Sequence, residues 1–200
     1  MKIPSKYFLF FHCMVGIYKP TNIKHPATTL SEKQICILRS SKNSNNLIHK
    51  NGFTTLAKYC NIYYLHHALD IVDIGAGGNG VGHVEFTSDG MQCYALVLLY
   101  IATNDERYAQ TAITIQEAWQ NNLKEFKGTN APLEMAWGAT CFVRAFELLK
   151  YQYPKWSIQI ETSFNKYIDK FIIPILKVRY NEVEKWNNNW ILTIQEALIQ

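Results

Sequence analysis

The sequence lacks several features that would assign it to a functional class at once. Its 20 Lys and Arg residues nearly balance 16 Asp and Glu residues, the net charge is +4, and neither sign forms a long run. Because the net charge is small and the charges are scattered, no nucleic-acid partner is predicted. Beyond the first 18 residues, no apolar run approaches the roughly 20 residues that a membrane-spanning helix needs, so no membrane span is expected.

Signals for metal sites and disulfides are also missing. The five cysteines lie far apart and form no Cys-x-x-Cys motif: Cys13, Cys36, Cys60, Cys93 and Cys141. None of the six histidines belongs to an HExxH motif or lies at zinc-ligand spacing from a cysteine. The sequence therefore predicts no metal site, no cofactor and no disulfide framework.

The N-terminus is the one candidate targeting segment. Lys2 and Lys6 precede an apolar stretch at 7–17, and residues 1–18 resemble a signal peptide with a poor cleavage site. A periplasmic or secreted location is the expectation that follows. We expect residues 19–200 to form the folded part, because 48% of the chain is hydrophobic and 14% is aromatic, which suffices for a sizeable core.

The first half of the folded part combines helical signals with one strong loop signal. Thr29 and Glu32 have the spacing of a capping box before a short helix. A second helical stretch is predicted over about 53–69, and five glycines follow within 75–82.

From Ser88 onward the chain is predicted to be helical throughout. Gly128 is expected to end the second of these helices and Pro174 to kink or end the fourth. The helices begin at capping or proline signals: Ser88, Asn104, Asn130-Ala131-Pro132, Pro154 and Asn189. Short connections make successive helices antiparallel, so an all-α fold of helical hairpins is expected. The last helix reaches Gln200 without a stop signal, which predicts that these residues are the N-terminal part of a longer domain.

The glycine-rich segment offers a competing interpretation. Residues 75–80 match GxGxxG after an apolar run, and they resemble the first motif of S-adenosylmethionine-dependent methyltransferases. That motif needs a helix directly after the glycines and then a second strand ending in an acidic residue. The sequence that follows does not alternate strands with helices, so no parallel sheet is expected. A loop beside a cleft is the preferred interpretation, and a methyltransferase remains the second alternative.

Histidines and one helix supply candidate binding residues. His83 lies in the glycine-rich loop beside Glu85, where it could touch a substrate. His66 and His67 are expected on different faces of a helix, as ordinary surface or core residues. Four residues of the third helix have spacings that place several of them on adjoining faces: Asn130, Glu134, Trp137 and Arg144. Such aromatics are mostly core residues, but indole faces beside amide and guanidinium groups also suit a sugar-binding cleft.

The run from Trp186 to Trp190 encloses three consecutive asparagines. These asparagines either cap a helix or present amides to a ligand carboxylate or hydroxyl group. Both interpretations remain open at this point.

Taken in order, a set of segments resembles the alginate lyase-like domain of polysaccharide lyases. The resemblance runs from about residue 24 to the end, and its segments are His25-Pro26, 29–39, 82–86 with Asp89, 103–109, 117–119, 130–138, 144–150 and 187–190. It implies an incomplete (α/α) toroid of antiparallel helical hairpins around a cleft. It further implies β-elimination on a uronic-acid polysaccharide such as alginate or glucuronan.

The resemblance also implies roles for individual residues. Asn187 and Asn189 match the family's Asn-x-Asn-Trp pattern and are the candidates for neutralising the substrate carboxylate, with Trp190 as a wall of the site. Family members carry an Asn-His pair in this region, whereas no histidine follows His83 here. A non-catalytic carbohydrate-binding helical domain is therefore the first alternative to a polysaccharide lyase.

Overall fold

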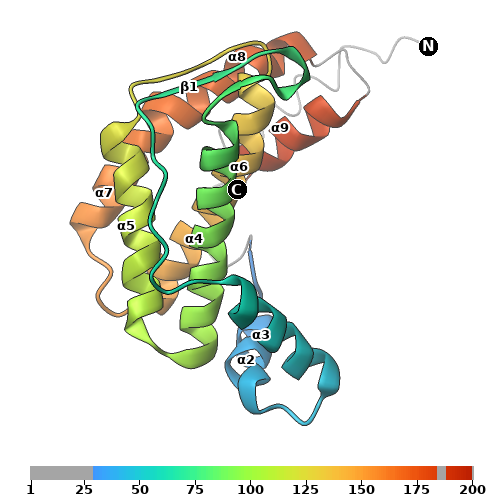
Figure 1. Cartoon of the computed structure of the whole chain (residues 1–200), viewed down its shortest axis with the longest axis vertical. Coiled ribbons are helices and arrows are strands. Elements are labelled where there is room, and N and C mark those ends of the chain that lie inside the picture. The colour runs from blue at the N-terminus through green and yellow to red at the C-terminus, as the bar shows by residue number, and fades with distance from the viewer. Residues whose placement is uncertain (1–28, 184–187, 200) are drawn as a thin grey trace, which may run out of the picture.

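The computed structural model describes residues 29–183 and 188–199, most of which are helical (Figure 1). The α-helices of this part are α2 (Glu32–Ser40), α3 (Leu47–Tyr59), α4 (His83–Thr103), α5 (Glu106–Asn122), α6 (Ala131–Gln152), α7 (Ile158–Tyr167), α8 (Ile173–Val183) and α9 (Asn189–Ile199). The strands are β1 (Ile71–Ile74), β2 (Gly80–Val81) and β3 (Glu125–Lys127). Short 3₁₀ turns lie at Ser41–Asn43 and Ala76–Gly78, and a π-helical turn at Ile168–Ile172 joins α7 to α8. The expectation of a mostly helical fold is confirmed.

Helices α4 and α6 lie side by side and run in the same direction. Near their first turns the hydroxyl of Thr87 lies 3.5 Å from a carboxylate oxygen of Glu134. Near their last turns the hydroxyl of Tyr100 donates to the carbonyl oxygen of Gln152. Between them in sequence, α5 returns antiparallel beside α4, and these two form the kind of hairpin that the short connection predicts (Figure 1).

Helix α9 runs in the same direction along α6. Thr129, just before α6, and Trp190, at the start of α9, both contact Arg179 of α8. Further along both helices, Arg144 of α6 forms an ion pair with Glu196 of α9 at 2.6 Å. The N-terminal ends of α4, α6 and α9 therefore lie at one end of the helical layer.

The core lies where α4, α5 and α6 meet. The ring of Phe86 packs edge-on against Trp119 and Phe126, with both pairs of ring centroids 5.1 Å apart. All three side chains are almost completely buried. Gly138 lets α6 approach this ring, because a Cβ at that position would collide with Phe86.

A small sheet covers the end of the molecule where α4 and α6 begin (Figure 1). Its strand order is β2-β1-β3, with β1 antiparallel to β2 and parallel to β3. Val72 and Ile74 of β1 and Phe126 of β3 turn their side chains into the core. The expectation that no parallel pairing would form is therefore wrong, since the α4–α5 hairpin provides the crossover between β1 and β3.

The glycine-rich segment forms the turn of a hairpin between β1 and β2. Asp73 pairs with Val81, and the amide of Gly75 donates to the carbonyl of Asn79 at 2.6 Å. Gly80 has a φ of 151°, and a Cβ there would overlap the carbonyl of Asp73. The chain thus turns back along β1, which differs from the strand-to-helix turn of a nucleotide-binding loop.

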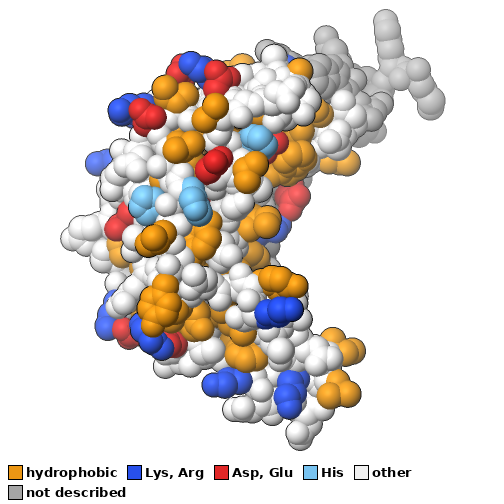
Figure 2. Space-filling view, in the orientation of Figure 1, with side chains coloured by type: hydrophobic (Ala, Val, Ile, Leu, Met, Phe, Trp, Pro, Cys, Tyr) orange, Lys and Arg blue, Asp and Glu red, His pale blue; other side chains and the backbone are white. Residues whose placement is uncertain are grey.

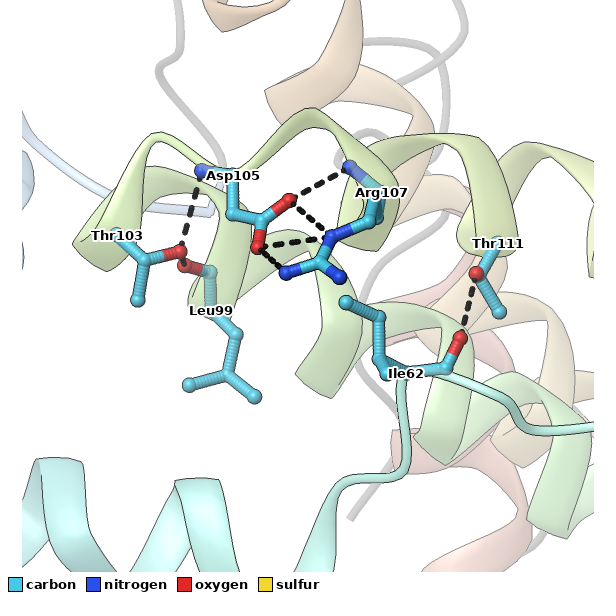
Figure 3. A network of polar contacts seen from close by, with 6 residues as sticks. All are labelled: Ile62, Leu99, Thr103, Asp105, Arg107 and Thr111. Atoms are coloured by element: carbon cyan, nitrogen blue, oxygen red, sulfur yellow. Dashed lines mark hydrogen bonds and ion pairs between the residues drawn. The ribbon is translucent and has the colours of Figure 1, made fainter.

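Helix α4 begins earlier than predicted. Its N-cap is Gly82, with a φ of 87°, and its first residue is His83. The predictions that Ser88 starts the helix and that His83 lies in the loop are therefore wrong. Asn104 also differs from expectation, because it ends α4 in a left-handed conformation with a φ of 58°. The cap of α5 is Asp105, whose carboxylate accepts from the amide and guanidinium of Arg107 (Figure 3).

Other predicted boundaries also shift. The capping box before α2 joins Ser31 to Gln34, so the predicted Thr29–Glu32 box is wrong. Helix α5 ends at Asn122, so β3 separates it from Gly128. Pro174 lies in the first turn of α8, where it neither ends nor interrupts the helical path from the π-helical turn. The predicted starts of α6, after Asn130 with proline in the first turn, and of α9, at Asn189, are confirmed.

The predicted helix over 53–69 is confirmed as far as Tyr59 and is wrong for 60–69. Helix α3 ends at Tyr59, and residues 60–70 run as an irregular segment along α4 and α5 to β1 (Figure 1). The hydroxyl of Thr111 on α5 donates to the carbonyl of Ile62 at 2.9 Å (Figure 3). Closer to the sheet, the side-chain amide of Asn122 reaches the carbonyl of Ala68. Among the helices that the structure describes, none combines the length and apolarity needed to cross a membrane.

Candidate functional site

Two of the predicted site residues meet at the first turns of α4 and α6. Burial raises the pKa of the Glu134 carboxyl group, and His83 and the hydroxyl of Thr87 partly offset this effect. The Nδ1 atom of His83 is buried and has no hydrogen-bond partner among the described residues. The geometry therefore brings a histidine and a carboxyl group together where two parallel helices begin.

The other predicted residues of α6 have different surroundings. Asn130 occupies the N-cap position, although its side chain accepts no capping hydrogen bond. Trp137 is 43% exposed, which is unusual for a tryptophan on a well-packed helix. Arg144 lies two turns further along and pairs with Glu196. Trp137 therefore lies on the surface, against the more common expectation of a core aromatic.

The asparagine run lies at the start of α9. Asn188 caps this helix, because its side-chain oxygen accepts from the amide of Trp190 at 3.0 Å. Asn189 is the exposed first residue of the helix, and the guanidinium of Arg179 lies 5.4 Å from the Trp190 ring centroid. Asn187 lies outside the described residues. Capping thus accounts for Asn188 and leaves the Asn189 side chain facing solvent.

A separate cavity of about 560 Å³ lies between α3, the irregular 60–70 segment and α4. Its polar lining comes from Tyr59, Tyr64, His67, Glu85, Ser88 and Gln92, and aliphatic side chains and Met91 form the rest. A volume of this size is typical of small-ligand pockets. Val84 and Glu85 belong to the first turn of α4, next to His83, so this cavity adjoins the predicted site residues on that helix.

A buried carboxylate organises one wall of this cavity. Asp89 is completely buried, and its Oδ1 accepts from the hydroxyl of Tyr64 at 2.8 Å and contacts Nδ1 of His67 at 3.1 Å. Its Oδ2 accepts from the backbone amide of His67 at 2.8 Å and from Nε1 of Trp119 at 2.7 Å. Donors therefore surround both carboxylate oxygens, as an ionised carboxylate requires.

This arrangement defines the hydrogen-bonding state of His67. With Nδ1 donating to Asp89, the neutral ring carries its proton on Nδ1 and keeps an acceptor lone pair on Nε2. The His67 side chain is 55% exposed and lines the cavity, so its outer edge is accessible. Burial and the adjacent Asp89 raise the pKa of the Tyr64 hydroxyl, which therefore stays a donor.

Sequence reasoning missed the pairing of His67 with Asp89. It placed His66 and His67 on a helix, whereas both lie in the irregular segment, where Nδ1 of His66 accepts from the nearby amide of Ala68. Asp89 gave a usable signal, because an acidic residue in the middle of an apolar helix needs a buried partner. The identity of that partner depends on tertiary contacts across 22 residues, which helical spacing does not indicate.

Comparisons of the chain with protein-family models, with curated proteins and with solved structures find no match.

Proposed function

We propose that the chain is a polysaccharide lyase that cleaves uronic-acid polymers, such as alginate or glucuronan, by β-elimination. The fold in this proposal is an incomplete (α/α) toroid, in which α4, α6 and α9 belong to an inner ring. The observation that carries the proposal is the meeting of His83 and Glu134, far apart in sequence, at the first turns of α4 and α6. Trp190 begins α9 beside Arg179, which also donates to the carbonyl of Thr129 just before α6. The ordered resemblance to alginate lyase-like domains supports the same function, and a uronate polymer would be met in the periplasm or outside the cell.

The reaction makes three chemical demands. A base takes the proton from C5, the electron pair forms the C4–C5 double bond, and O4 leaves with a proton from an acid. The substrate carboxylate must be neutralised so that the C5 proton becomes acidic. In the proposal, the exposed amide of Asn189 performs this neutralisation at the N-terminus of α9, where the helix dipole favours an anion. Asn187 shares the role, and Trp190 forms a wall of the site.

Residues of α4 and α6 bind the rest of the sugar chain. His83 and Asn130 lie at the starts of these helices, and Trp137 offers an exposed indole face for a sugar ring. Glu134 has a raised pKa and therefore retains a proton to higher pH than an ordinary glutamate, which suits a group that donates to a departing oxygen. Arg144 lies further along the same helix and extends the binding surface.

A non-catalytic carbohydrate-binding domain is the second candidate function. It is favoured by the capping role of Asn188 and by the ion pair that already engages Arg144. The methyltransferase is not proposed, because the GxGxxG segment closes a β-hairpin and leaves no strand-to-helix turn for a cofactor.

The ultraviolet absorbance of the unsaturated uronate product tests the proposal. The purified chain is mixed with alginate and, separately, with glucuronan, and the absorbance is followed over time. We expect a rise that Asn189→Ala abolishes and that Asn165→Ala, an exposed asparagine within α7, leaves unchanged. A flat trace from folded protein that still binds either polymer would support the binding domain and contradict the lyase.

A further inference from the structure

The cavity between α3, the 60–70 segment and α4 has an unusual charge pattern for a site beside a uronate polymer. Glu85 is the charged residue of its lining, and neither lysine nor arginine contributes to that lining. The Glu85 carboxylate has no ion-pair partner within the described part of the chain. In Figure 2, histidine, acidic and hydrophobic side chains lie over the upper middle of this face, and Lys or Arg side chains lie over α3 and along the outer edges. Lys58 lies at the α3 side of the cavity, where its Nζ is 5.3 Å from the ring centroid of the lining residue Tyr59. A sugar carboxylate placed beside Glu85 would meet repulsion from that carboxylate.

Two hydrogen-bonding groups of the cavity, on Glu85 and His67, are acceptors that require donors. The carboxylate of Glu85 is an acceptor. In the neutral His67 ring, whose Nδ1 proton points to Asp89, the outer Nε2 is also an acceptor. Asp89 is completely buried and has donors on both oxygens, so its own position is fixed by the packing of the fold. The contacts of His67 with Asp89 therefore fix the position of the imidazole. Hydroxyl groups are the natural partners of two such acceptors.

The remaining lining suits the apolar faces of a sugar ring. Leu56, Val84, Met91 and Ala95 line the cavity together with the rings of Tyr59 and Tyr64. Val84 and Met91 are each 57% exposed, so their side chains form an accessible apolar floor on α4. Sugar rings combine hydroxyl edges with C–H faces, and an aromatic and aliphatic wall binds those faces.

We propose that this cavity is a subsite for an uncharged, hydroxyl-bearing sugar ring, and that the substrate is a polymer in which uronate alternates with a neutral sugar. The inference rests on the proposed lyase function and narrows its substrate class. The cavity begins at Val84 and Glu85, directly beside His83 in the first turn of α4. A neutral ring in the cavity therefore places the next sugar of the chain, the uronate, over the starts of α4 and α6.

The first test compares two polymers that share 4-linked glucuronate. Heparosan alternates glucuronate with N-acetylglucosamine, and glucuronan contains glucuronate alone. We expect kcat/KM for elimination to be about tenfold higher on heparosan. Glu85→Gln should raise the value on glucuronan about fivefold and leave heparosan within about twofold. Glu117→Gln, an exposed glutamate on α5, is the matched control and should change neither.

The second test measures binding and does not depend on turnover. The imidazole signals of His67 are followed by NMR during titration with N,N′-diacetylchitobiose, a neutral disaccharide, and with methyl glucuronide. We expect the neutral sugar to shift these signals and the glucuronide to leave them in place. His67→Ala should abolish neutral-sugar binding, whereas His66→Ala, a neighbouring histidine outside the cavity lining, should retain it.

The two tests separate failure of the subsite from failure of the lyase. Absence of elimination from every polymer, with His67 still responding to the neutral sugar, would overturn the lyase and retain the subsite. Elimination that is equally fast on glucuronan and heparosan and insensitive to Glu85→Gln would overturn the subsite and retain the lyase. Binding of the glucuronide at His67 as strong as that of the neutral sugar, or no response to either, would also overturn it.

Discussion

Asp89 is the residue whose substitution best tests the reasoning about the cavity wall. Asp89→Ala removes the acceptor from four donor groups, two of which are on His67, one on Tyr64 and one on Trp119. Trp119 is 1% exposed, so its Nε1–H would lose its partner without access to water. That loss costs about 1–3 kcal/mol, and the lost bonds to the half-exposed Tyr64 and His67 add about 1 kcal/mol each. We expect Asp89→Ala to lower the free energy of unfolding by about 4 kcal/mol.

Asp89→Asn should destabilise the protein much less than Asp89→Ala and should still change the tautomer of His67. The asparagine carbonyl can keep the two donors that cannot adapt, the His67 amide and Trp119 Nε1. Its amide group then faces Tyr64 and Nδ1 of His67, which can accept by turning the hydroxyl and by exchanging the ring tautomer. The expected cost is about 1 kcal/mol. His67 would then carry its proton on Nε2 and lose the acceptor that faces the cavity.

Urea unfolding followed by circular dichroism measures both stability changes, and imidazole nitrogen NMR reports the tautomer. A double-mutant cycle with Trp119→Phe isolates the buried bond, because Asp89→Ala should cost about 1–3 kcal/mol less in a chain without that donor. The reasoning is refuted if Asp89→Ala costs under about 1 kcal/mol, if Asp89→Asn costs as much as Asp89→Ala, or if His67 keeps its tautomer in Asp89→Asn.

Three further predictions concern packing and ionisation. Gly138→Ala should destabilise the protein by about 1–3 kcal/mol, because the new methyl group collides with Phe86. Gly52→Ala, in open space on α3, should stabilise it by about 0.5–1 kcal/mol. Thermal unfolding measures both changes, and equal shifts would contradict the packing at Gly138. Burial raises the pKa of the Cys60 thiol to about 11, so alkylation at pH 8 should modify the exposed Cys36 well before Cys60. Peptide mass spectrometry would record the order, and earlier modification of Cys60 would contradict the raised pKa. The folded-state pKa of Glu134 is raised, so ionisation of this carboxyl group destabilises the folded protein as pH rises above its ordinary pKa. Glu134→Gln should therefore increase the free energy of unfolding more at pH 7 than at pH 4. An equal change at both pH values in urea unfolding would contradict the raised pKa.

Local sequence signals predicted the elements whose stability depends on neighbours along the chain. Asn130 before a proline and the asparagines before Trp190 marked helix starts that the structure confirms. At α9 the signal is a local side-chain cap from Asn188, and at α6 it is the proline in the first turn. The helix predicted after Asn104 corresponds to α5, which begins at Glu106. Most of the helical layer was therefore predictable from spacing and capping.

The small sheet was not predictable in this way. Strands β2 and β3 contain two and three residues, too few to show an alternating pattern. The parallel pairing of Val72 with Phe126 joins residues on either side of the α4–α5 hairpin. Long-range contacts place these strands together, among them the packing of Phe126 against Phe86 and the bond from the Lys124 amide to the Asp70 carbonyl. Hydrophobic periodicity along the sequence does not indicate contacts between residues so far apart in the chain.

The cavity wall illustrates the same limit at the candidate binding site. Residues 60–70 have no helix or sheet of their own, and side chains of neighbouring helices satisfy their polar groups. Asp89 on α4 holds Tyr64 and His67, and Thr111 on α5 holds the carbonyl of Ile62. The backbone amide and Nδ1 of His67 both contact the buried Asp89, and these two contacts fix the orientation of the ring. A histidine in an irregular segment can therefore be a rigid part of a binding site, and the buried carboxylate on the adjacent helix is the feature that identifies it.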